Sequence, residues 1–273
     1  MSLMDAPLGK SSDYPDSYDP ALLFPVARDL NRRRIGLDDG RWPWFGEDLW
    51  QGWEISWLRP DGVPAVAWAE MTVPAASPSI VESKSVKLYL NSLNQAVFSS
   101  AERVEEVIAQ DLSSASGAAV SVRLHSVDEG MRLVGRPEGF VLIDEETLEN
   151  VSYHYQPEAL ALVSSEPVTE RLCSHLLKSN CPVTGQPDWA TLLVEYTGPA
   201  IDRASLLRYL VGFRQTRDFH EHCVETIFTD LMARCQPQSL TVRARYTRRG
   251  GLDINPVRST EPNVDMGPRL IRQ

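Results

Sequence analysis

The sequence lacks the signatures of several common functional classes. Its 273 residues include only four cysteines, which form neither a C-x-x-C pair nor a zinc-finger spacing. No G-x-G-x-x-G or G-x-x-x-x-G-K-[ST] motif occurs, so a bound nucleotide would not use a Rossmann or P-loop cradle. Basic residues (27) are fewer than acidic ones (37), and the net charge of −10 argues against a general nucleic-acid binder. An anionic ligand must therefore be held by a local cluster of cations and backbone N–H groups.

Long apolar runs are absent as well. No stretch approaches the ~18 residues that a membrane-spanning helix needs, and Met1–Asp5 has neither the basic nor the apolar region of a secretion signal. We therefore expect a cytoplasmic protein with reduced thiols and no membrane partner. Hydrophobic residues make up 42% of the chain, enough for one large core or for two domains of about 130 residues.

The first half of the chain has the pattern of two strands, two helices and two further strands. A turn at Arg59–Gly62 predicts a hairpin, and apolar residues at helical spacing predict helices, with Ser83 as an N-cap. The predicted strands cover residues 50–58, 65–73, 119–124 and 139–143, and the predicted helices residues 82–94 and 102–112. Residues 1–20 are polar and turn-rich, and we expect an extended arm there.

The second half repeats this order. Strands are predicted at residues 190–196, 240–246 and 252–257, and helices at residues 204–213 and 220–233. A shift of 120 residues aligns Ser85, Tyr89, Leu90 and Gln95 with Ser205, Tyr209, Leu210 and Gln215. Sparse identities that agree with a repeated element order indicate an internal duplication. We expect an N-terminal extension over residues 1–30, one module over 31–150 and a second over 151–273.

Cys181 is the candidate nucleophile. It lies in a turn-rich loop, and the carboxylate of Asp188 follows seven positions later. Free cysteine is among the most buried residue types, but the neighbouring Asn, Pro and Gly residues favour an exposed loop. A thiolate and a nearby acid are the parts of a covalent mechanism, and a nitrile is one electrophile whose nitrogen needs a proton after attack. The other cysteines are interpreted as buried residues on predicted helices: Cys173, Cys223 and Cys235.

A second candidate cluster begins a predicted helix at His220. Glu221 could accept two hydrogen bonds from a guanine-like edge, and Phe219 could stack on a ring. An acidic first turn that complements the helix dipole is an equally natural interpretation. His220 and His222 diverge on a helix, and Val224 replaces the second His of an H-E-x-x-H motif. We therefore predict no metal site.

Two short segments offer local positive charge. Glu82-Ser83-Lys84 opens a helix whose N–H groups, together with Lys84, attract phosphate, and Arg249-Gly250 places a cation in a turn. Each segment alone is as typical of a solvated cap or turn. Because these polar features are divided between the two halves, we expect a site assembled where the halves, or two subunits, meet.

Three elements together resemble the nitrile oxidoreductase family that reduces 7-cyano-7-deazaguanine (preQ0), in its long two-module form. They are Glu82-Ser83-Lys84-Ser85-Val86-Lys87-Leu88-Tyr89, Cys181-Pro182-x-Thr184-Gly185-Gln186-Pro187-Asp188 and Phe219-His220-Glu221. The resemblance spans residues 20–262. It implies an α+β tunnelling fold (T-fold) of two tandem β-β-α-α-β-β modules. It also implies reduction of preQ0 to 7-aminomethyl-7-deazaguanine (preQ1) by two NADPH, in the pathway to the tRNA nucleoside queuosine.

The resemblance also implies roles for individual residues. Cys181 attacks the nitrile to give a covalent thioimide, and Asp188 donates a proton, with the division of proton transfers between Asp188 and His220 left open. The implied substrate contacts are Val81, Glu82, Ser83, Phe219, His220 and Glu221. The implied NADPH contacts are Ser83, Lys84, Arg249 and Gly250. We expect a homodimer. We expect no metal and no direct nucleic-acid partner.

Two alternatives stay open. A nitrilase-like thiol hydrolase would form the same adduct but let water attack it and release ammonia. A catalytically silent T-fold module would only bind a purine or pterin. Ammonia release together with nicotinamide absorbance separates the first alternative, and loss of turnover in Cys181→Ala separates the second.

Overall fold

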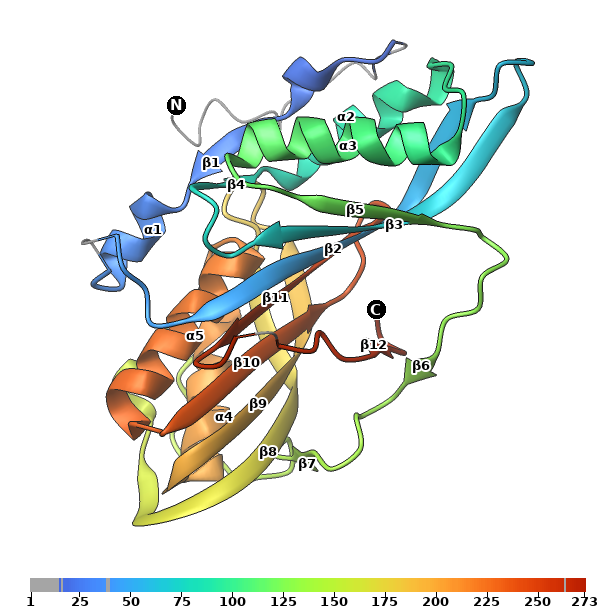
Figure 1. The fold of residues 1–273 in the computed structure, drawn as a ribbon. Coiled ribbons are helices and arrows are strands. Elements are labelled where there is room, and N and C mark those ends of the chain that lie inside the picture. Colours follow the sequence, from blue (N-terminus) through green and yellow to red (C-terminus); the bar gives the residue numbers. More distant parts are fainter. Residues whose placement is uncertain (1–14, 16, 38–39, 263) are drawn as a thin grey trace. The chain divides into compact units, whose positions relative to one another are not determined.

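The computed structural model describes residue 15 and residues 17–37, 40–262 and 264–273, so most of the expected N-terminal arm lies outside the described residues. The chain is a mixed α+β protein that divides into two compact units (Figure 1). The first unit contains the residues up to 30 together with 47–131 and 248–254. The second contains residues 31–46, 132–247 and 255–273. Neither unit is continuous in sequence, and the expected module boundaries stay a prediction.

The first unit is built on three antiparallel strands, β2 (Phe45–Leu58), β3 (Pro64–Pro74) and β5 (Ser121–His125), with β3 in the middle. Strands β1 (Pro25–Ala27) and β4 (Ser79–Val81) form a separate antiparallel sheet of two strands. Helices α2 (Ser83–Ser92) and α3 (Ala101–Ser116) bury their apolar faces against the strands. The remaining short helices are 3-10 turns, η2 (Pro20–Leu22) and η3 (Leu93–Gln95).

The N-cap of helix α2 is one residue earlier than the sequence suggested. We predicted Ser83 as the N-cap, but Glu82 is the cap, and its carboxylate accepts from the N–H groups of Lys84 and Ser85, both at 2.8 Å. The longer Glu side chain reaches forward to the first turn and satisfies two N–H groups that have no partner within the helix. Ser83 is instead the first helical residue.

The second unit has four antiparallel strands in the order β8-β9-β10-β11: β8 (Leu162–Asn180), β9 (Pro187–Ile201), β10 (Ser239–Tyr246) and β11 (Leu252–Ser259). Helices α4 (Arg203–Val211) and α5 (His220–Cys235) pack along one face of them (Figure 1). The short elements are η4 (Pro157–Ala159), η5 (Gly212–Gln215), and a pair of β6 (Leu133–Val134) with β12 (Arg269–Leu270). Helix α1 (Asp29–Arg34) spans the boundary between the units.

Strand β8 is the main element that the sequence did not predict. Its pairing with β9 shifts register at three places, between Leu162 and Ser164, Ser164 and Pro167, and Ser174 and Leu177. Each irregularity interrupts the period-two alternation that identifies a strand in a sequence. Cys173, which we placed on a helix, lies in this strand.

The strand predicted at residues 139–143 also differs from expectation. It is present as the two-residue strand β7 (Val141–Leu142), but it pairs in parallel with β8 and belongs to the second unit. The first unit therefore lacks, among the described residues, the fourth strand that we expected it to gain from this segment. The other predicted strands and helices are present, most of them longer than predicted. No helix in the described part of the chain is long and apolar enough to cross a membrane.

The same side-chain contacts occur in each unit at positions that the sequence comparison had paired. The hydroxyl of Ser85 donates to the Glu82 carbonyl at 2.6 Å, and that of Ser205 donates to the Asp202 carbonyl at 2.7 Å. A helix tyrosine in each unit donates to a carboxylate on the next helix. These pairs are Tyr89 with Asp111 and Tyr209 with Asp230. Each unit thus fixes its two helices to one another in the same way.

Candidate active site

Cys181 lies at the tip of the β8–β9 hairpin. Its N–H donates to the carbonyl of Gln186 at 2.8 Å, and its carbonyl accepts from the N–H of Gly185 at 3.0 Å. Gly185 has φ +69°, a left-handed conformation that glycine adopts without the cost of a side chain. The backbone on both sides of the cysteine is therefore fixed by the turn itself.

The pairing of the hairpin places Cys181 and Asp188 on one face. Ser179 is directly opposite Asp188 in the ladder, so these two side chains share a face. Cys181 lies one residue beyond the end of β8, where its N–H bond to the Gln186 carbonyl extends the pairing by one position. Since side chains alternate between faces, this extension places Cys181 on the same face as Ser179 and Asp188. Their exposed fractions are 0%, 3% and 6%. Cys181 and Asp188 are diagonal neighbours, for which Cβ atoms lie about 7–8 Å apart or less. A small reacting group between the thiol and the carboxyl could contact both.

The burial of Cys181 corrects the expectation of an exposed loop. The turn residues around it do form a loop at the surface, since Thr184 and Gln186 are exposed. Among residues 181–186 only Cys181 is buried, and it is the residue directly after the end of β8. Turn composition indicated the backbone conformation correctly and the side-chain environment wrongly.

His220 reaches the same carboxylate from helix α5. Its Nε2 lies 3.5 Å from Oδ2 of Asp188, which is ion-pair distance when the imidazole is protonated. The ring stacks on Tyr246 with centroids 3.7 Å apart and planes 2° apart. Nδ1 is buried and has no hydrogen-bond partner among the residues that the structure describes. Stacking therefore fixes the orientation of the ring, and Nε2 faces Asp188.

Asn180 connects the cysteine loop to the segment that leads into α5. Its N–H donates to the Thr216 carbonyl at 2.9 Å, and its carbonyl accepts from the N–H of Asp218 at 3.1 Å. Its side-chain amide donates to the carbonyls of Arg214 and Thr216. Because Asn180 directly precedes Cys181, these bonds set the distance between the thiol and His220. Sequence reasoning noted Asn180 only as a turn residue.

The remaining predicted residues of this cluster form the first turn of α5. Phe219 is the N-cap residue, and its N–H donates to the side chain of Asp218 at 2.8 Å. Asp218 also contacts Nδ1 of His222 at 2.8 Å. Glu221 is 1% exposed, and its position in the first turn complements the helix dipole. A carboxylate buried in this position can recognise a ligand that presents N–H donors.

The other three cysteines have environments that disfavour thiolate formation. Burial raises the pKa of Cys173 to about 12 and that of Cys235 to about 11. Burial also raises the pKa of Cys223. Since the thiolate is the nucleophilic form, these cysteines are core residues, as the sequence interpretation held.

The predicted residues of the first unit lie in two segments, the start of α2 and the turn before β11. Val81 ends β4, and Glu82, Ser83 and Lys84 form the start of α2. Val81 and Glu82 are buried, whereas Ser83 and Lys84 are partly exposed. Two of the N–H groups that we considered for phosphate binding already bond to the Glu82 carboxylate, so positive charge at this helix start depends mainly on the Lys84 side chain.

Arg249 and Gly250 lie in the tight turn that leads into β11. The N–H of Arg249 donates to the Leu252 carbonyl at 3.0 Å, and Gly250 has φ +58°. A Cβ placed on Gly250 would lie 3.4 Å from Nζ of Lys87, so the second turn of α2 contacts this turn. The sequence offered a signal for Lys87 that we did not use: it lies three residues after Lys84, on the same helical face.

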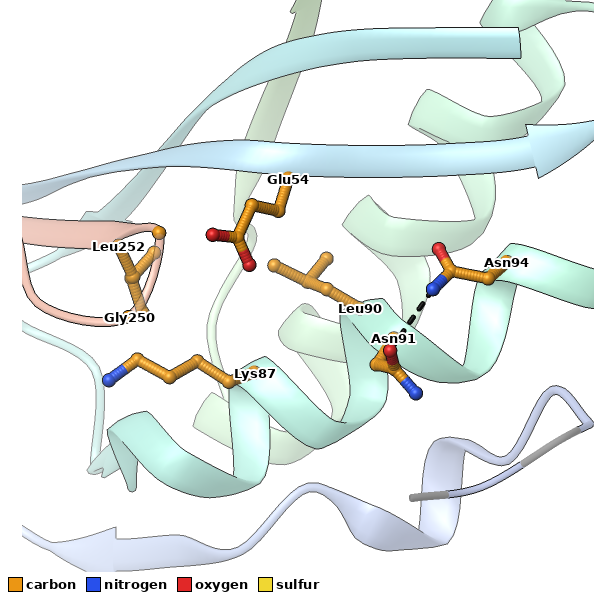
Figure 2. A pocket seen from close by; sticks show the side chains of 8 residues that line it. Glu54, Lys87, Leu90, Asn91, Asn94, Gly250 and Leu252 are labelled. Atoms are coloured by element: carbon orange, nitrogen blue, oxygen red, sulfur yellow. Dashed lines mark hydrogen bonds between the residues drawn. The ribbon is translucent and has the colours of Figure 1, made fainter. Parts of the chain in front are cut away.

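A cavity of ≈ 90 Å³ lies between this turn and α2. Figure 2 shows Glu54 pointing into it from β2, with Lys87 and Leu90 from the helix. The amide of Asn94 donates to Asn91 at 3.0 Å on the same wall. The cavity thus presents a carboxylate, an ammonium and amide groups beside the backbone of Gly250.

The structure therefore gathers the predicted residues into two groups, one in each unit. Cys181, Asp188 and the Phe219–Glu221 segment meet in the second unit, and the Val81–Lys84 segment and Arg249-Gly250 lie in the first. Tyr246, which orients His220, was missed because a contact across 26 residues leaves no local pattern. Among the described residues, no group of three or more His, Cys, Asp or Glu side chains could hold a metal ion.

Comparison with known proteins identifies the class to which this chain is related. Residues 14–124 match the family model described as "Nitrile reductase, 7-cyano-7-deazaguanine-reductase N-term". Residues 187–264 match the model described as "QueF-like protein". The second match begins at the residue before Asp188 and includes the start of α5. The class is that of the nitrile reductases.

Curated relatives agree over nearly the whole chain, and each is named NADPH-dependent 7-cyano-7-deazaguanine reductase. The protein from Azoarcus sp. (strain BH72) is 54% identical over 258 residues, covering 94% of this chain and 91% of its own. That from Dechloromonas aromatica is 50% identical over 256 residues (93% and 90%), and that from Chromohalobacter salexigens is 50% identical over 273 residues (100% and 98%). The chain belongs to the NADPH-dependent 7-cyano-7-deazaguanine reductase family.

Among solved structures, the apo form of the archaeosine synthase QueF-Like aligns with part of the chain. It covers 38% of this chain and 95% of its own, at 17% identity and a TM-score of 0.29. A TM-score this low supports no inference about the present chain.

Proposed function

We propose that this protein reduces the nitrile of preQ0 to the primary amine of preQ1 with two NADPH. The observation that carries the proposal is the buried pair of Cys181 and Asp188 on one face of the hairpin, in a chain whose relatives are named for this reaction. The product is a precursor of the tRNA nucleoside queuosine, and we expect the reaction to occur in the cytoplasm.

The proposed chemistry starts with addition of the Cys181 thiolate to the nitrile carbon. A C–S bond forms, one π bond of the nitrile breaks, and the nitrogen takes a proton to give a thioimide. Asp188, which His220 contacts through Nε2, is positioned to supply that proton. Hydride delivery to the same carbon and departure of the Cys181 sulfur as thiolate leave an imine. A second hydride and a proton complete the amine, so the balance is one nitrile, two NADPH and two protons.

The substrate is recognised in this proposal by buried polar groups and rings. Glu221 accepts from the N–H groups at the guanine-like edge of preQ0, and the deazapurine ring contacts Phe219. Val81, Glu82 and Ser83 complete the substrate contacts. A guanine-like ligand can donate charge-assisted hydrogen bonds to Glu221, whereas a purine without these N–H donors cannot. The buried carboxylate therefore favours guanine-like ligands.

Positive charge for NADPH comes from Lys84 and Arg249, with backbone contacts at Ser83 and Gly250. NADPH is a co-substrate that supplies hydride when bound. Lys84 is partly exposed at the start of α2, and Arg249 is partly exposed in the turn before β11. These cations offset locally the net charge of −10.

We also propose that the chain is a tandem duplication of the T-fold module. The matched contacts of Ser85 with Ser205 and of Tyr89 with Tyr209 support this origin, as does the β-β-α-α-β-β order of β8 to β11. T-fold modules close barrels by joining several copies, because an open strand edge needs a partner. A homodimer follows from this proposal.

The decisive experiment mixes the protein with preQ0 in the absence of NADPH and measures its intact mass. We expect a gain equal to one preQ0 in the wild type and none in Cys181→Ala. Cys173→Ala is the matched control, since it removes another buried thiol, within strand β8, and should leave the adduct intact. NADPH should then be consumed at two per preQ1 formed.

Three outcomes would overturn the proposal in different ways. A missing adduct in the folded wild type would remove covalent catalysis. Ammonia release without NADPH oxidation would assign a nitrile hydrolase instead. Binding of preQ0 that is unchanged by Cys181→Ala, with no turnover in either protein, would leave only a binding module.

A further inference from the structure

An aromatic stack crosses the first unit on the strand face opposite helices α2 and α3. The rings of Trp53 and Trp68 are stacked, with centroids 5.0 Å apart and planes 13° apart. Trp68 in turn stacks on His125 at 3.9 Å and 10°. The rings come from three neighbouring strands, β2, β3 and β5, so pairing of the strands holds them in line. Trp68 and His125 are 7% and 8% exposed, which makes the base of the stack rigid.

The exposed end of this stack carries Arg248. Its guanidinium lies over the Trp53 ring at 5.4 Å from the centroid. Because Trp68 covers one face of the Trp53 ring, the guanidinium lies against the other. A cation over an aromatic face is attracted by the ring quadrupole. Arg248 directly precedes Arg249 and Gly250, so this contact fixes one end of the turn over residues 248–251.

Trp53 also bonds directly to the other end of the 248–251 turn. Its backbone N–H donates to the Gly251 carbonyl at 2.8 Å, and its indole Nε1 donates to Asp253 Oδ2 at 3.0 Å. These bonds are available because the pairing of β2 with β3 shifts register between Gly52 and Ile55. The bulge releases the N–H of Trp53 from the ladder.

Glu54, the residue after Trp53, also contacts the 248–251 turn. A Cβ on Gly251 would lie 2.4 Å from Cδ of Glu54, so the Glu54 side chain packs directly against the glycine backbone. Figure 2 shows Glu54 on β2 facing Gly250 and Leu252. The 248–251 turn is thus held by Arg248 on the indole, by Trp53 hydrogen bonds and by contact with Glu54.

We propose that Trp53 is a positioning residue for NADPH binding, acting through the 248–251 turn. This inference rests on the proposed function, which assigns Arg249 and Gly250 to the cofactor. Trp53 does not act on the nitrile or the thiol. It sets the direction of the Arg249 side chain and of the Gly250 backbone by fixing both ends of a short, glycine-rich turn. A turn with two glycines has high backbone freedom, so without the indole it would bind the cofactor more weakly.

The test separates cofactor binding from nitrile capture. Trp53→Leu removes the stack and the indole N–H. We expect its KM for NADPH to rise at least about fivefold, because the loss of one cation–π contact of about 1 kcal/mol corresponds to that factor. Trp53→Phe keeps a stacking ring and the backbone N–H bond but loses the indole N–H to Asp253, so its KM for NADPH should rise clearly less than in Trp53→Leu. Formation of the preQ0 adduct on Cys181 needs no NADPH, and its rate should be unchanged in both variants.

Arg248 provides a second route to the same answer if Trp53→Leu does not fold. Arg248 is exposed, so Arg248→Met should fold and raise the KM for NADPH. Arg59→Met is the matched control: Arg59 is an exposed arginine of the β2–β3 turn paired with Asp61 at 2.9 Å, and its loss should change nothing. If Arg248 acts through Trp53, the double variant should raise the KM no more than the larger single effect.

Each outcome has a distinct meaning. No adduct in the wild type would overturn the proposed function, and the positioning role of Trp53 with it, because that role rests on the assignment of Arg249 and Gly250 to NADPH. A normal adduct, with an unchanged NADPH KM in folded Trp53→Leu or Arg248→Met, would overturn the positioning role alone. Additive effects in the double variant would also overturn it, because Arg248 would then contact the cofactor independently of Trp53.

Discussion

Asp188 is the residue on which the proton balance of the proposed reaction depends. It is buried beside the thiol on the hairpin face and is contacted by a histidine whose ring is fixed by stacking. Its position in a regular part of the β8–β9 ladder, opposite Ser179, means that loop motion does not move it. A fixed acid suits a step in which nitrogen becomes basic only after sulfur adds.

Asp188→Asn should slow formation of the preQ0 adduct by about 10²-fold or more, because an amide of the same shape cannot donate the proton. The rate is measured by quenching the reaction at intervals and recording intact mass. Asp128→Asn, at an exposed carboxylate of a turn, is the matched control and should behave as the wild type. An adduct that forms at the normal rate in Asp188→Asn would assign the proton to another donor, with His220 the first to examine.

At this scale the sequence predicted the types of residue and not their surroundings. Cys181 and Asp188 were recognisable because turn residues and a following strand bracket them. The burial of Cys181 was not predictable, since it depends on which face of a hairpin is covered. The stacking of His220 on Tyr246 joins α5 to β10 and has no local signature.

Hydrogen bonds between neighbouring helices are the feature of the elements that recurs. Tyr89 on α2 donates to Asp111 on α3 at 2.6 Å, and Tyr209 on α4 donates to Asp230 on α5. A further tyrosine donates to each carboxylate, Tyr18 to Asp111 and Tyr155 to Asp230. Burial raises the pKa of Asp230, so its phenol donors offset part of the cost of keeping that carboxylate charged.

Tyr89→Phe and Tyr209→Phe should each lower the free energy of unfolding by about 1.5–3 kcal/mol, the range for a hydrogen bond to a charged group. Urea denaturation measures this change. Tyr153→Phe, at an exposed tyrosine (51%), should stay within about 0.5 kcal/mol of the wild type. A large loss in one variant and none in the other would contradict an equivalent role for the two contacts.

Regular elements were predictable from their periodicity, and irregular ones were not. Helices α3 and α5 have apolar residues at helical spacing and were predicted nearly to their ends. Strand β8 was missed because three register shifts break its alternation. The Glu82 cap was misassigned to Ser83 because short side chains are the usual caps, whereas here a longer carboxylate reaches the same N–H groups.

For the whole molecule, the sign of the charge is the property most relevant to binding. NADPH is a polyanion and the chain has a net charge of −10, so attraction must come from a few cations close to the cofactor. Such local attraction is screened by salt, because the Debye length falls from about 10 Å at 0.1 M to about 3 Å at 1 M.

Raising the ionic strength from about 0.05 to about 0.5 M should raise the KM for NADPH several-fold. The KM for preQ0, which has no net charge at neutral pH, should change little and serves as the internal control. Initial rates at saturating concentrations of the other substrate measure both values. An NADPH KM that stays constant or falls with salt would contradict recognition by Lys84 and Arg249.

The closure of the hairpin tip by the bonds between Cys181, Gly185 and Gln186 has a consequence for how this protein can change over evolutionary time. Loop length is free to vary only among residues 182–184, inside the closed tip. One residue added between Gln186 and Asp188 would turn the carboxylate to the opposite face of the strand, since side chains alternate with period two. Insertions and deletions in descendants of this gene should therefore gather inside the tip, and an odd change beyond it should mark a lineage that has abandoned the reaction.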